Sequence, residues 1–299
     1  MTLVPRSALA RLTDGPVPVE DIADQAIQAL RDTGATIERC EDGYRLSGLS
    51  YGGAAVAAHL DAPYEIEWVE TVESTNQLGR RRGFEGHTDR VVLAAEQTGG
   101  RGRRDRDWLS PAGGVWLSLV LEPTLKPDRR ALLTFAAAVG VVDAAAATGV
   151  TAQIKWPNDV VIPDPETDRK VGGILTEVKT SEAGAPFAVV GVGINADVDP
   201  AVLPRDATSL RAVTDTVDRA TVATTVIETV HELRGDPDRI LDRWQGAART
   251  LGQRVRITTE STELEGTAVD ITETGALLVD DGTTHHEVTV GDCEHLRPT

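Results

Sequence analysis

Apolar side chains recur with two spacings along the chain, every third or fourth residue in some segments and every second residue in others. Residues 19–34 follow the first spacing, which predicts an amphipathic helix that ends near Gly34. Residues 35–46 favour a hairpin that turns at Glu41-Asp42-Gly43. A helix followed by a small hairpin is compatible with a winged-helix domain, which we place at residues 1–60.

The middle of the chain, residues 64–248, holds most of the predicted strands. Strands are predicted at residues 64–70, 90–96, 114–123, 152–162, 171–180 and 187–197. Helices are predicted at residues 74–84, 129–149, 220–235 and 237–248. Strands and helices do not alternate regularly, and several strands look linked by hairpins. The predicted fold class is therefore α+β, with a mixed sheet and helices on one side, and not a doubly wound fold.

Residues 251–299 differ from the rest of the chain. They form a series of short β runs separated by Gly and Asp turns, which predicts a small barrel of the SH3 type.

Composition favours a soluble cytoplasmic protein. No stretch approaches the roughly 20 apolar residues that a membrane span needs, and the N-terminus lacks the basic and apolar segments of a secretory signal. The two cysteines, Cys40 and Cys293, lie near opposite ends and predict neither a disulfide framework nor a metal site.

The charge balance is strongly acidic, with a formal net charge of -17. Only four of the 30 basic residues are lysines. An acid-rich, lysine-poor composition is typical of proteins from salt-loving archaea, where salt screens the repulsion between carboxylates. It also argues against a general nucleic-acid binder, which needs a basic face.

Several common catalytic motifs are absent from the sequence. There is no P-loop, no H-E-x-x-H, no C-x-x-C and no G-x-S-x-G. His285 and His286 are adjacent in a β run and point to opposite faces, so we expect surface residues and no metal site.

Residues 99–108, "GGRGRRDRDW", gather four arginines between glycines. One interpretation is a flexible loop that binds an anion, and the other is a solvated surface turn. Taken alone, the surface turn is the safer interpretation.

A second candidate is "KWPND" at residues 155–159, followed by "RKVGG" at 169–173. Lys155 and Lys170 can each approach a carboxylate or phosphate end-on. Gly172 and Gly173 leave room for a ligand beside the backbone. The structural alternative for the first motif is a strand end with a packed Trp156. For the two glycines it is a strand bulge, which is compatible with a binding role.

Two shorter motifs place polar side chains at the ends of elements. "ESTN" (73–76) stands at a predicted helix start, where helix capping explains only part of the pattern. "GVGIN" (191–195) ends an apolar strand with Asn195, which either terminates the strand or displays an amide beside a cleft.

The four motifs occur in one order, and from about residue 64 onwards the chain resembles the biotin protein ligases. The resemblance implies a catalytic domain like that of class II synthetases, followed by the C-terminal barrel. It implies that ATP and Mg²⁺ activate biotin to biotinyl-5′-AMP, and that a lysine of a biotin carboxyl carrier protein, part of a carboxylase, then takes the biotinyl group. It also leaves open a homodimer that pairs through the central sheet.

The resemblance also implies roles for individual residues. Biotin would be bound by Ser74, Thr75, Asn76, Gln97, Gly100, Arg101, Gly102, Arg103, Lys170, Gly172 and Gly173. ATP would be bound by Arg103, Arg106, Trp108, Lys155, Asn158 and Asn195. Catalysis would depend on Lys170, Arg101 and Asp159, with Asp159 orienting or deprotonating the incoming lysine. No residue is assigned to a metal.

The chain departs from the family pattern within the catalytic part. Asp105 stands where the family commonly has glycine; its carboxylate could weaken anion binding, or pair with Arg103 or Arg106 when the loop is open. Residues 163–168 lengthen the turn before Lys170, which we expect only to extend a hairpin. A lipoate–protein ligase is the alternative enzyme, and "GRGRR" together with "KWPND" argues against it.

The N-terminal region departs further. It matches the end of a DNA-binding winged helix but lacks the turn and the start of the recognition helix. Residues 1–50 carry five basic and eight acidic residues, the opposite of what phosphate binding requires. We expect a degenerate domain; a biotin-responsive repressor is the alternative.

Overall fold

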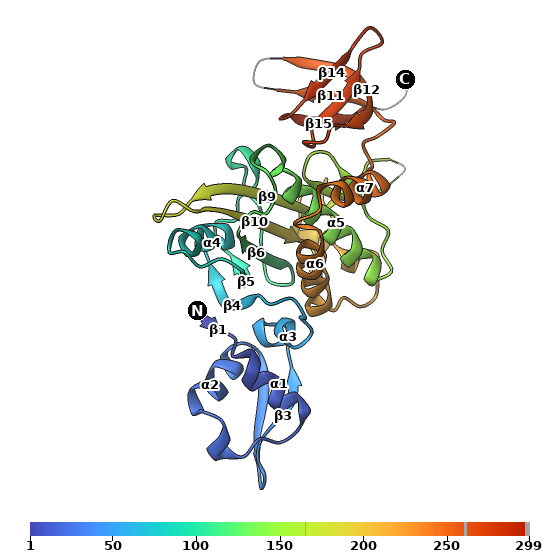
Figure 1. The fold of residues 1–299 in the computed structure, drawn as a ribbon. Helices are drawn as coiled ribbons and strands as arrows, with labels where there is room; N and C mark the ends of the chain where they lie inside the picture. The colour runs from blue at the N-terminus through green and yellow to red at the C-terminus, as the bar shows by residue number, and fades with distance from the viewer. Residues whose placement is uncertain (165, 260–261, 297–299) are drawn as a thin grey trace.

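The computed structural model describes residues 1–164, 166–259 and 262–296 and has three parts (Figure 1). An N-terminal part lies at one end of a central sheet with its helices, and a small all-β part lies at the other end.

The N-terminal part combines short helices with a hairpin. Its elements are β1 (Thr2–Leu3), α1 (Arg6–Asp14), α2 (Asp24–Asp32), β2 (Ala35–Cys40), β3 (Gly43–Leu49) and α3 (Gly53–Ala58). The predicted hairpin is present, with Cys40 paired to Gly43 at its turn. The predicted helix begins at Asp24, later than expected, because residues 19–21 form a single 3-10 turn and Ala23 is extended. Helices α1 and α3 were not predicted.

The central part is built on one large mixed sheet. Its further strands are β4 (Glu65–Val72), β5 (Arg90–Gln97), β6 (Val115–Leu121), β7 (Gln153–Lys155), β8 (Asp159–Ile162), β9 (Arg169–Thr180) and β10 (Pro186–Ile194). The strand order is β1-β4-β5-β6-β10-β9-β8-β7. The pair β4–β5 is parallel and the other neighbours are antiparallel, which confirms the mixed sheet. The predicted strand at 152–162 is divided into β7 and β8 by a turn at residues 156–158.

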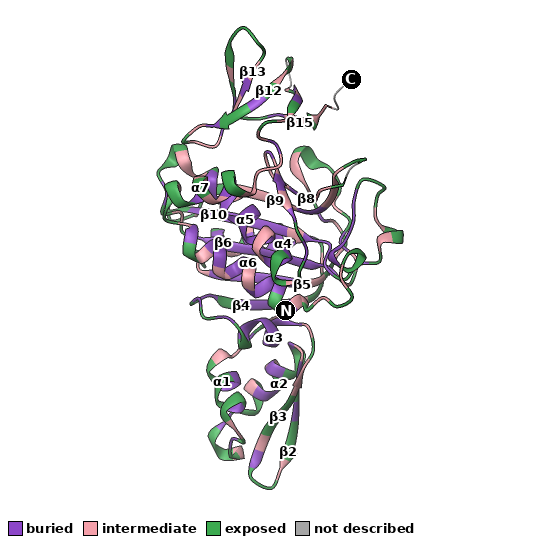
Figure 2. Cartoon of the chain, turned by 90° about the vertical axis from the view of Figure 1, so that its right-hand side faces the viewer, coloured by how far each residue is buried: buried purple, intermediate pink, exposed green. Residues whose placement is uncertain are grey.

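Helices cover both faces of this sheet. They are α4 (Thr75–Phe84), α5 (Leu132–Ala147), α6 (Arg219–Leu233) and α7 (Pro237–Ala247). Helix α5 packs on one face together with α6 and α7, as predicted, whereas α4 packs on the other face over Val120, Phe187 and Val189. The physical reason is that every residue of β6 is buried, so both of its faces need a cover. Figure 2 shows this concentration of buried residues in the sheet and in α5 and α6.

One segment corrects the expectation that no stretch could span a membrane. Residues Pro127–Ala147 form a helical segment of 21 residues that is long and apolar enough by composition. However, 61% of its most apolar window is buried inside the protein, as expected for the core helix α5.

The C-terminal part is a five-stranded sheet of short strands. These are β11 (Arg254–Thr258), β12 (Glu263–Ile271), β13 (Leu277–Asp280), β14 (His285–Val288) and β15 (Asp292–His295), in the order β14-β13-β12-β11-β15. We call it the C-terminal barrel. It is joined to the "KWPND" turn by two hydrogen bonds: Trp156 N donates to Thr250 Oγ1, and Trp156 Nε1 donates to Gly275 O.

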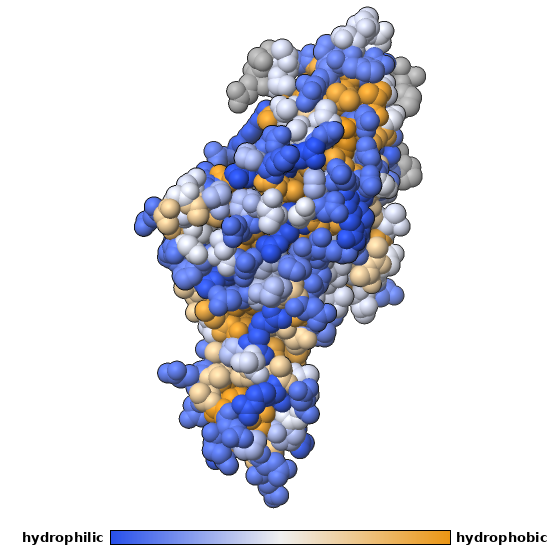
Figure 3. All heavy atoms as spheres, viewed as in Figure 1, coloured by the Kyte–Doolittle hydropathy of each residue, from blue (hydrophilic) through white to orange (hydrophobic). Residues whose placement is uncertain are grey.

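The surface reflects the charge of the chain. Most of the face shown in Figure 3 is hydrophilic, and apolar side chains gather on it near the junction of the N-terminal part with the sheet and on the C-terminal barrel. His285 and His286 lie at the surface of the barrel, where each contacts an aspartate, and no cluster of metal-ligating residues occurs among the described residues.

Candidate active site

The four sequence motifs meet around one cavity of about 430 Å³ on the α4 face of the sheet. Most of the predicted site residues line it: Ser74, Thr75, Asn76, Gln97, Arg101, Gly102, Arg103, Arg106, Trp108, Lys155, Asn158, Asp159, Lys170, Gly173 and Asn195. Gly172 does not, because it faces α5: a methyl group there would lie 3.2 Å from Val141 Cγ1. Gly100 lies at the base of the loop, packed against the Trp108 carbonyl.

Hydrogen-bonding side chains from the start of α4 and from β5 and β6 form a layer, which we call the polar bed: Ser74, Thr75, Asn76 and Ser118 are buried, and Gln97 is half-buried. The Ser74 side chain caps the helix, as predicted, by accepting from Gln77 N. Thr75 N and Oγ1 both donate to Gln97 Oε1, at 2.8 and 3.1 Å. Ser118 Oγ lies 2.8 Å from Thr75 Oγ1 and 2.7 Å from Asn76 Oδ1. These bonds fix the orientation of each group before any ligand binds.

Glycines on β9 and β10 leave space above the sheet, and we call Gly173, Gly191 and Gly193 the glycine floor. A methyl group at Gly191 would lie 1.9 Å from Asn76 Oδ1, and one at Gly193 would lie 2.6 Å from Trp108 Nε1. Any larger residue would therefore displace a side chain of the site. Gly191 and Gly193 are not among the residues predicted for the site, although their spacing of two in "GVGIN" places them on one face of a strand.

Lys170 reaches the centre of the cavity from the start of β9. Its Nζ lies 2.6 Å from Asp159 Oδ1 and 4.9 Å from the centroid of the Trp108 ring. The register between β8 and β9 shifts here, because Val160 pairs with Gly172 but Val161 pairs with Lys170. This bulge leaves Val171 unpaired with β8 and turns Lys170 to the same face as Gly173. The bulge that the sequence suggested is thus present, and it places Lys170 on the face of the sheet that carries the cavity.

Two buried polar atoms at the cavity lack a partner within the described part of the chain. Trp108 Nε1 and Asn195 Oδ1 make no hydrogen bond there. The Asn195 amide is held by its other atom, since Nδ2 donates to Thr208 O. Unpaired buried polar groups are costly, so these atoms are suited to a ligand that pairs with them.

The arginine loop, residues 99–108, folds across the cavity toward the C-terminal barrel. Its arginines differ in their partners. Arg101 pairs with Asp107, and Arg104 and Arg106 pair with Asp292. Arg103 instead donates to two neutral acceptors, Asn158 Oδ1 at 3.0 Å and Gly291 O at 3.2 Å.

Arg103 differs from the other three arginines in burial as well. It is half-buried, whereas the others are exposed, and burial lowers the pKa of its guanidinium below the usual value. Its partners are neutral and it lines the cavity, so Arg103 is the arginine best placed to meet an anionic ligand.

With the loop folded across the cavity, Asp105 makes no ion pair among the described residues, and Arg103 and Arg106 bind other partners; a pairing with either arginine in an open loop stays a prediction. The backbone of Asp105 has a φ of 56°, in the left-handed region that favours glycine. This conformation gives a physical reason for a preference for glycine at this position.

The C-terminal barrel contributes two residues that the sequence analysis missed. Asp292 and Cys293, on β15, line the cavity. Burial raises the pKa of the Cys293 thiol to about 12, so this thiol stays protonated at neutral pH. No local pattern marks either residue, because their position depends on how the barrel docks.

Comparison with known proteins agrees with this geometry. Residues 68–195 match the biotin/lipoate A/B protein ligase family, and residues 250–296 match the biotin protein ligase C terminal domain. The fold, the cavity and these matches define a protein ligase of the biotin/lipoate class.

Individual relatives narrow the class. The bifunctional ligase/repressor BirA of Bacillus subtilis is 31% identical over 278 residues, covering 85% of this chain and 83% of that protein. The biotin–[acetyl-CoA-carboxylase] ligase of Mycobacterium tuberculosis is 32% identical over 247 residues, covering 78% of this chain and 90% of that protein. The chain belongs to the biotin protein ligase family and is a biotin ligase.

The solved structures give the same result. The biotin protein ligase from Aquifex aeolicus in complex with biotin and ATP has a TM-score of 0.63 and 25% sequence identity, covering 78% of this chain and 99% of that chain. The fold class and the C-terminal barrel are therefore those of biotin ligases.

Proposed function

We propose that this cavity joins biotin to ATP to form biotinyl-5′-adenylate and then transfers the biotinyl group to a carrier lysine. The observation that carries the proposal is the position of Lys170 Nζ, which lies beside Asp159 and Trp108 in the cavity shared by the polar bed and the arginine loop. A compact cation at this point can contact both a carboxylate and a phosphate.

The polar bed suits the ureido group of biotin, which needs both donors and acceptors. The glycine floor gives space for its apolar rings and chain. The biotin carboxylate would then point toward Lys170, and the nucleotide would contact Trp108, Asn158 and Asn195. Arg101 and Gly102 would cover the ligand as part of the arginine loop, with Arg103 and Arg106 near the phosphates.

The chemistry follows from these positions. An oxygen of the biotin carboxylate attacks the α-phosphorus of ATP, and pyrophosphate leaves. The amine of the acceptor lysine then attacks the carbonyl carbon, and AMP leaves. Lys170 would stabilise the negative charge that develops in the first step. Asp159 would orient Lys170 and could accept a proton from the acceptor amine in the second.

Magnesium would enter with ATP as part of the substrate. The Asp159 carboxylate lines the cavity, but no group of three or more metal-ligating side chains exists among the described residues. Phosphate oxygens and water would therefore supply most of its ligands, as is usual for Mg²⁺ at nucleotides.

The acceptor would be a carboxyl carrier protein. The M. tuberculosis relative is named for acetyl-CoA carboxylase, and we infer a carrier of that type here. Because the reaction consumes ATP, we infer a cytoplasmic location.

We also propose that the N-terminal part does not read DNA, although the B. subtilis relative is named as a repressor. The segment before α2 is a single 3-10 turn in place of a full helix. The exposed residues of α2 include Asp24 and Asp32, and Arg31 donates to the Ile37 carbonyl.

A mobility-shift assay with the chain's own promoter, biotin and ATP at high salt tests whether the N-terminal part binds DNA. Ligand-dependent binding would refute the proposal.

The adenylation site is tested by exchange of labelled pyrophosphate into ATP, catalysed by the full chain. Biotin should support exchange and lipoate should not. Thr75→Val should raise the biotin concentration needed, whereas Lys170→Met should lower the rate at saturation. Wild-type exchange by both variants would overturn the site.

Biotinylation of a lysate from the source organism then identifies the acceptor by the protein labelled.

A further inference from the structure

Helix α4, which begins with the polar bed, is clamped to the sheet on both sides by arginines. Its sequence contains three arginines in a row, and the outer two bind carboxylates on different strands. Arg80 pairs with Glu177 on β9 at 2.9 Å, and Arg82 pairs with Glu67 on β4 at 2.7 Å. Arg81, between them, is exposed.

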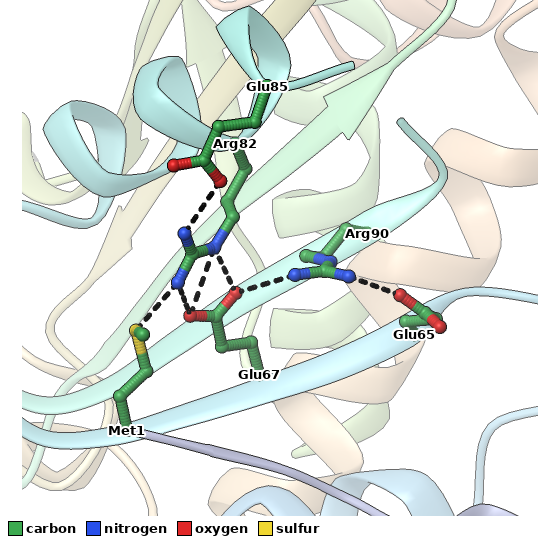
Figure 4. Close-up of polar contacts among 6 residues, drawn as sticks. All are labelled: Met1, Glu65, Glu67, Arg82, Glu85 and Arg90. Carbon is green, nitrogen blue, oxygen red and sulfur yellow. Dashed lines mark hydrogen bonds and ion pairs between the residues drawn. The ribbon is translucent and has the colours of Figure 1, made fainter. Parts of the chain in front are cut away.

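The pair on β4 is the more buried of the two. Glu67 is 1% exposed. Arg82 donates to both of its carboxylate oxygens through Nε and Nη2, and Arg90 Nη1 donates to it from β5 at 3.2 Å (Figure 4). Burial acts to raise the pKa of the Glu67 carboxyl, but hydrogen bonds and charges of the two arginines lower it below the usual value. The carboxyl is therefore ionised in the folded protein.

The spacing along α4 connects this pair to the polar bed. Arg82 follows Thr75 by seven residues, which is two turns of an α-helix, so both side chains lie on the same side of the helix. A bidentate guanidinium at one end fixes the rotation of the helix about its axis. That rotation sets where Thr75 points relative to Gln97 and Ser118.

The glycines of α4 make the helix sensitive to such a rotation. A methyl group at Gly79 would lie 3.1 Å from Val189 Cγ1, and one at Gly83 would lie 2.2 Å from the Phe187 ring. The helix backbone thus lies directly on the sheet, with no side chain at these points to hold it in register. The arginine pairs supply that restraint.

The N-terminal strand covers the Glu67–Arg82 pair. Leu3 of β1 pairs with Glu67 across the sheet edge, and Arg82 Nη2 donates to Met1 Sδ at 2.9 Å (Figure 4). This cover keeps water from the pair, which strengthens its hydrogen bonds.

We propose that Glu67 and Arg82 are positioning residues of the biotin site, which hold α4 in the rotation that presents Thr75 and Asn76 to biotin. The inference rests on the proposed function of those two residues. The inference concerns the binding of biotin and not of ATP, because the residues proposed to bind the nucleotide, Trp108, Asn158 and Asn195, lie outside α4.

The test is Arg82→Lys, which keeps the charge but loses the bidentate fork, with Arg81→Lys as the matched control. Biotin and ATP affinities of the full chain are measured separately by calorimetry, at a temperature where circular dichroism shows each variant folded. Arg82→Lys should weaken biotin binding about tenfold, the loss expected when one hydrogen bond from Thr75 or Asn76 to biotin is misplaced, and leave ATP binding unchanged. Arg81→Lys should change neither.

Unchanged biotin affinity in Arg82→Lys would overturn the inference, and so would equal weakening of biotin and ATP, which indicates a general loss of structure. If Arg82→Lys does not fold, Glu67→Gln, which keeps the shape of the side chain but removes its charge, takes its place, with the same expected pattern. Thr75→Val distinguishes a failure of the proposed biotin site from a failure of the positioning role. Wild-type biotin affinity in Thr75→Val contradicts the proposed site, whereas weakened binding there with unchanged Arg82→Lys contradicts only the positioning role.

Discussion

Asp292 on β15 accepts a hydrogen bond from Arg104 of the arginine loop at 3.0 Å, although 188 residues separate them in the chain. The same carboxylate also binds Arg106. The C-terminal barrel thus holds the loop that crosses the cavity, and this contact should affect how long an adenylate stays bound.

Asp292→Asn should shorten the lifetime of bound biotinyl-adenylate. The change removes the charge that holds Arg104 and Arg106, so the loop should open more often. Because the pairs are partly exposed, we expect an effect of only about threefold. The lifetime can be followed by release of labelled adenylate from the purified complex.

Glu294→Gln, on the same strand but paired with Arg256, is the control. A lifetime equal to that of the wild type would show that the Asp292 pairs do not hold the loop, and the effect should decrease at high salt.

Lys170→Met should slow adenylate formation by about 10²- to 10³-fold, the usual loss when one charge-stabilising group is removed. Folding should be little affected, because Lys170 is partly exposed and Asp159 can be solvated. Single-turnover release of pyrophosphate measures the step. Lys179→Met, at the exposed far end of the same strand, should behave like the wild type. A rate within a few-fold of the wild type for Lys170→Met would contradict the assigned role.

Asp105→Gly should stabilise the protein by up to about 1 kcal/mol, because glycine adopts the left-handed backbone of this position without strain. Urea unfolding gives the free energy. Asp105→Ala is the control, since it removes the carboxylate but keeps a Cβ at the same φ. Equal gains in both variants would mean that charge repulsion, and not backbone strain, limits stability at this position.

The free energy of unfolding should fall as the pH decreases from about 6.5 to about 4, in part because of His295. Burial, aided by the charge of Lys155, lowers the pKa of His295 to about 4. The unfolded chain therefore takes up the proton first, and protonation favours unfolding throughout this window. The shift corresponds to about 3 kcal/mol.

Urea unfolding between pH 4 and 7.5 tests this. In His295→Gln the fall in stability should be smaller by about that amount. His87→Gln, a change at an exposed histidine of the central part, is the control. A profile that is the same in His295→Gln and in the wild type would show that His295 is not buried in its neutral form.

The sequence predicted the motifs of the site better than their arrangement. Thr75, Lys170 and Asn195 were identified because each belongs to a motif with an unusual density of polar groups at the end of an element. Gly172 was assigned to the biotin site with Gly173, but adjacent residues of a strand face opposite sides, and Gly172 contacts α5. Strand periodicity places Gly172 and Gly173 on opposite faces of the sheet, but it does not say which face carries the site.

Other features depended on tertiary contacts that no local pattern records. Asp292 reaches the cavity only because the barrel docks on the "KWPND" turn. Helix α4 lies on its own face of the sheet because both faces of β6 are buried and need a cover. The continuous apolar run of β6 indicates that both faces are buried, but it does not say which helix covers which face. Helix α3 was missed because its six residues are too few for a helical period to show.

The bulge at Val171 also explains why the chain tolerates a longer connection before Lys170. Beyond the bulge, β9 still pairs with β8 on one edge, through Lys170 and Arg169. On its other edge, Lys170 N donates to Asp206 O, and Thr208 N donates to Lys170 O. Lys170 therefore has its own backbone anchors, independent of how many residues connect it to β8. The length of that connection can therefore differ without moving the lysine, because Asp206 and Thr208, and not residues 163–168, hold its backbone on that edge.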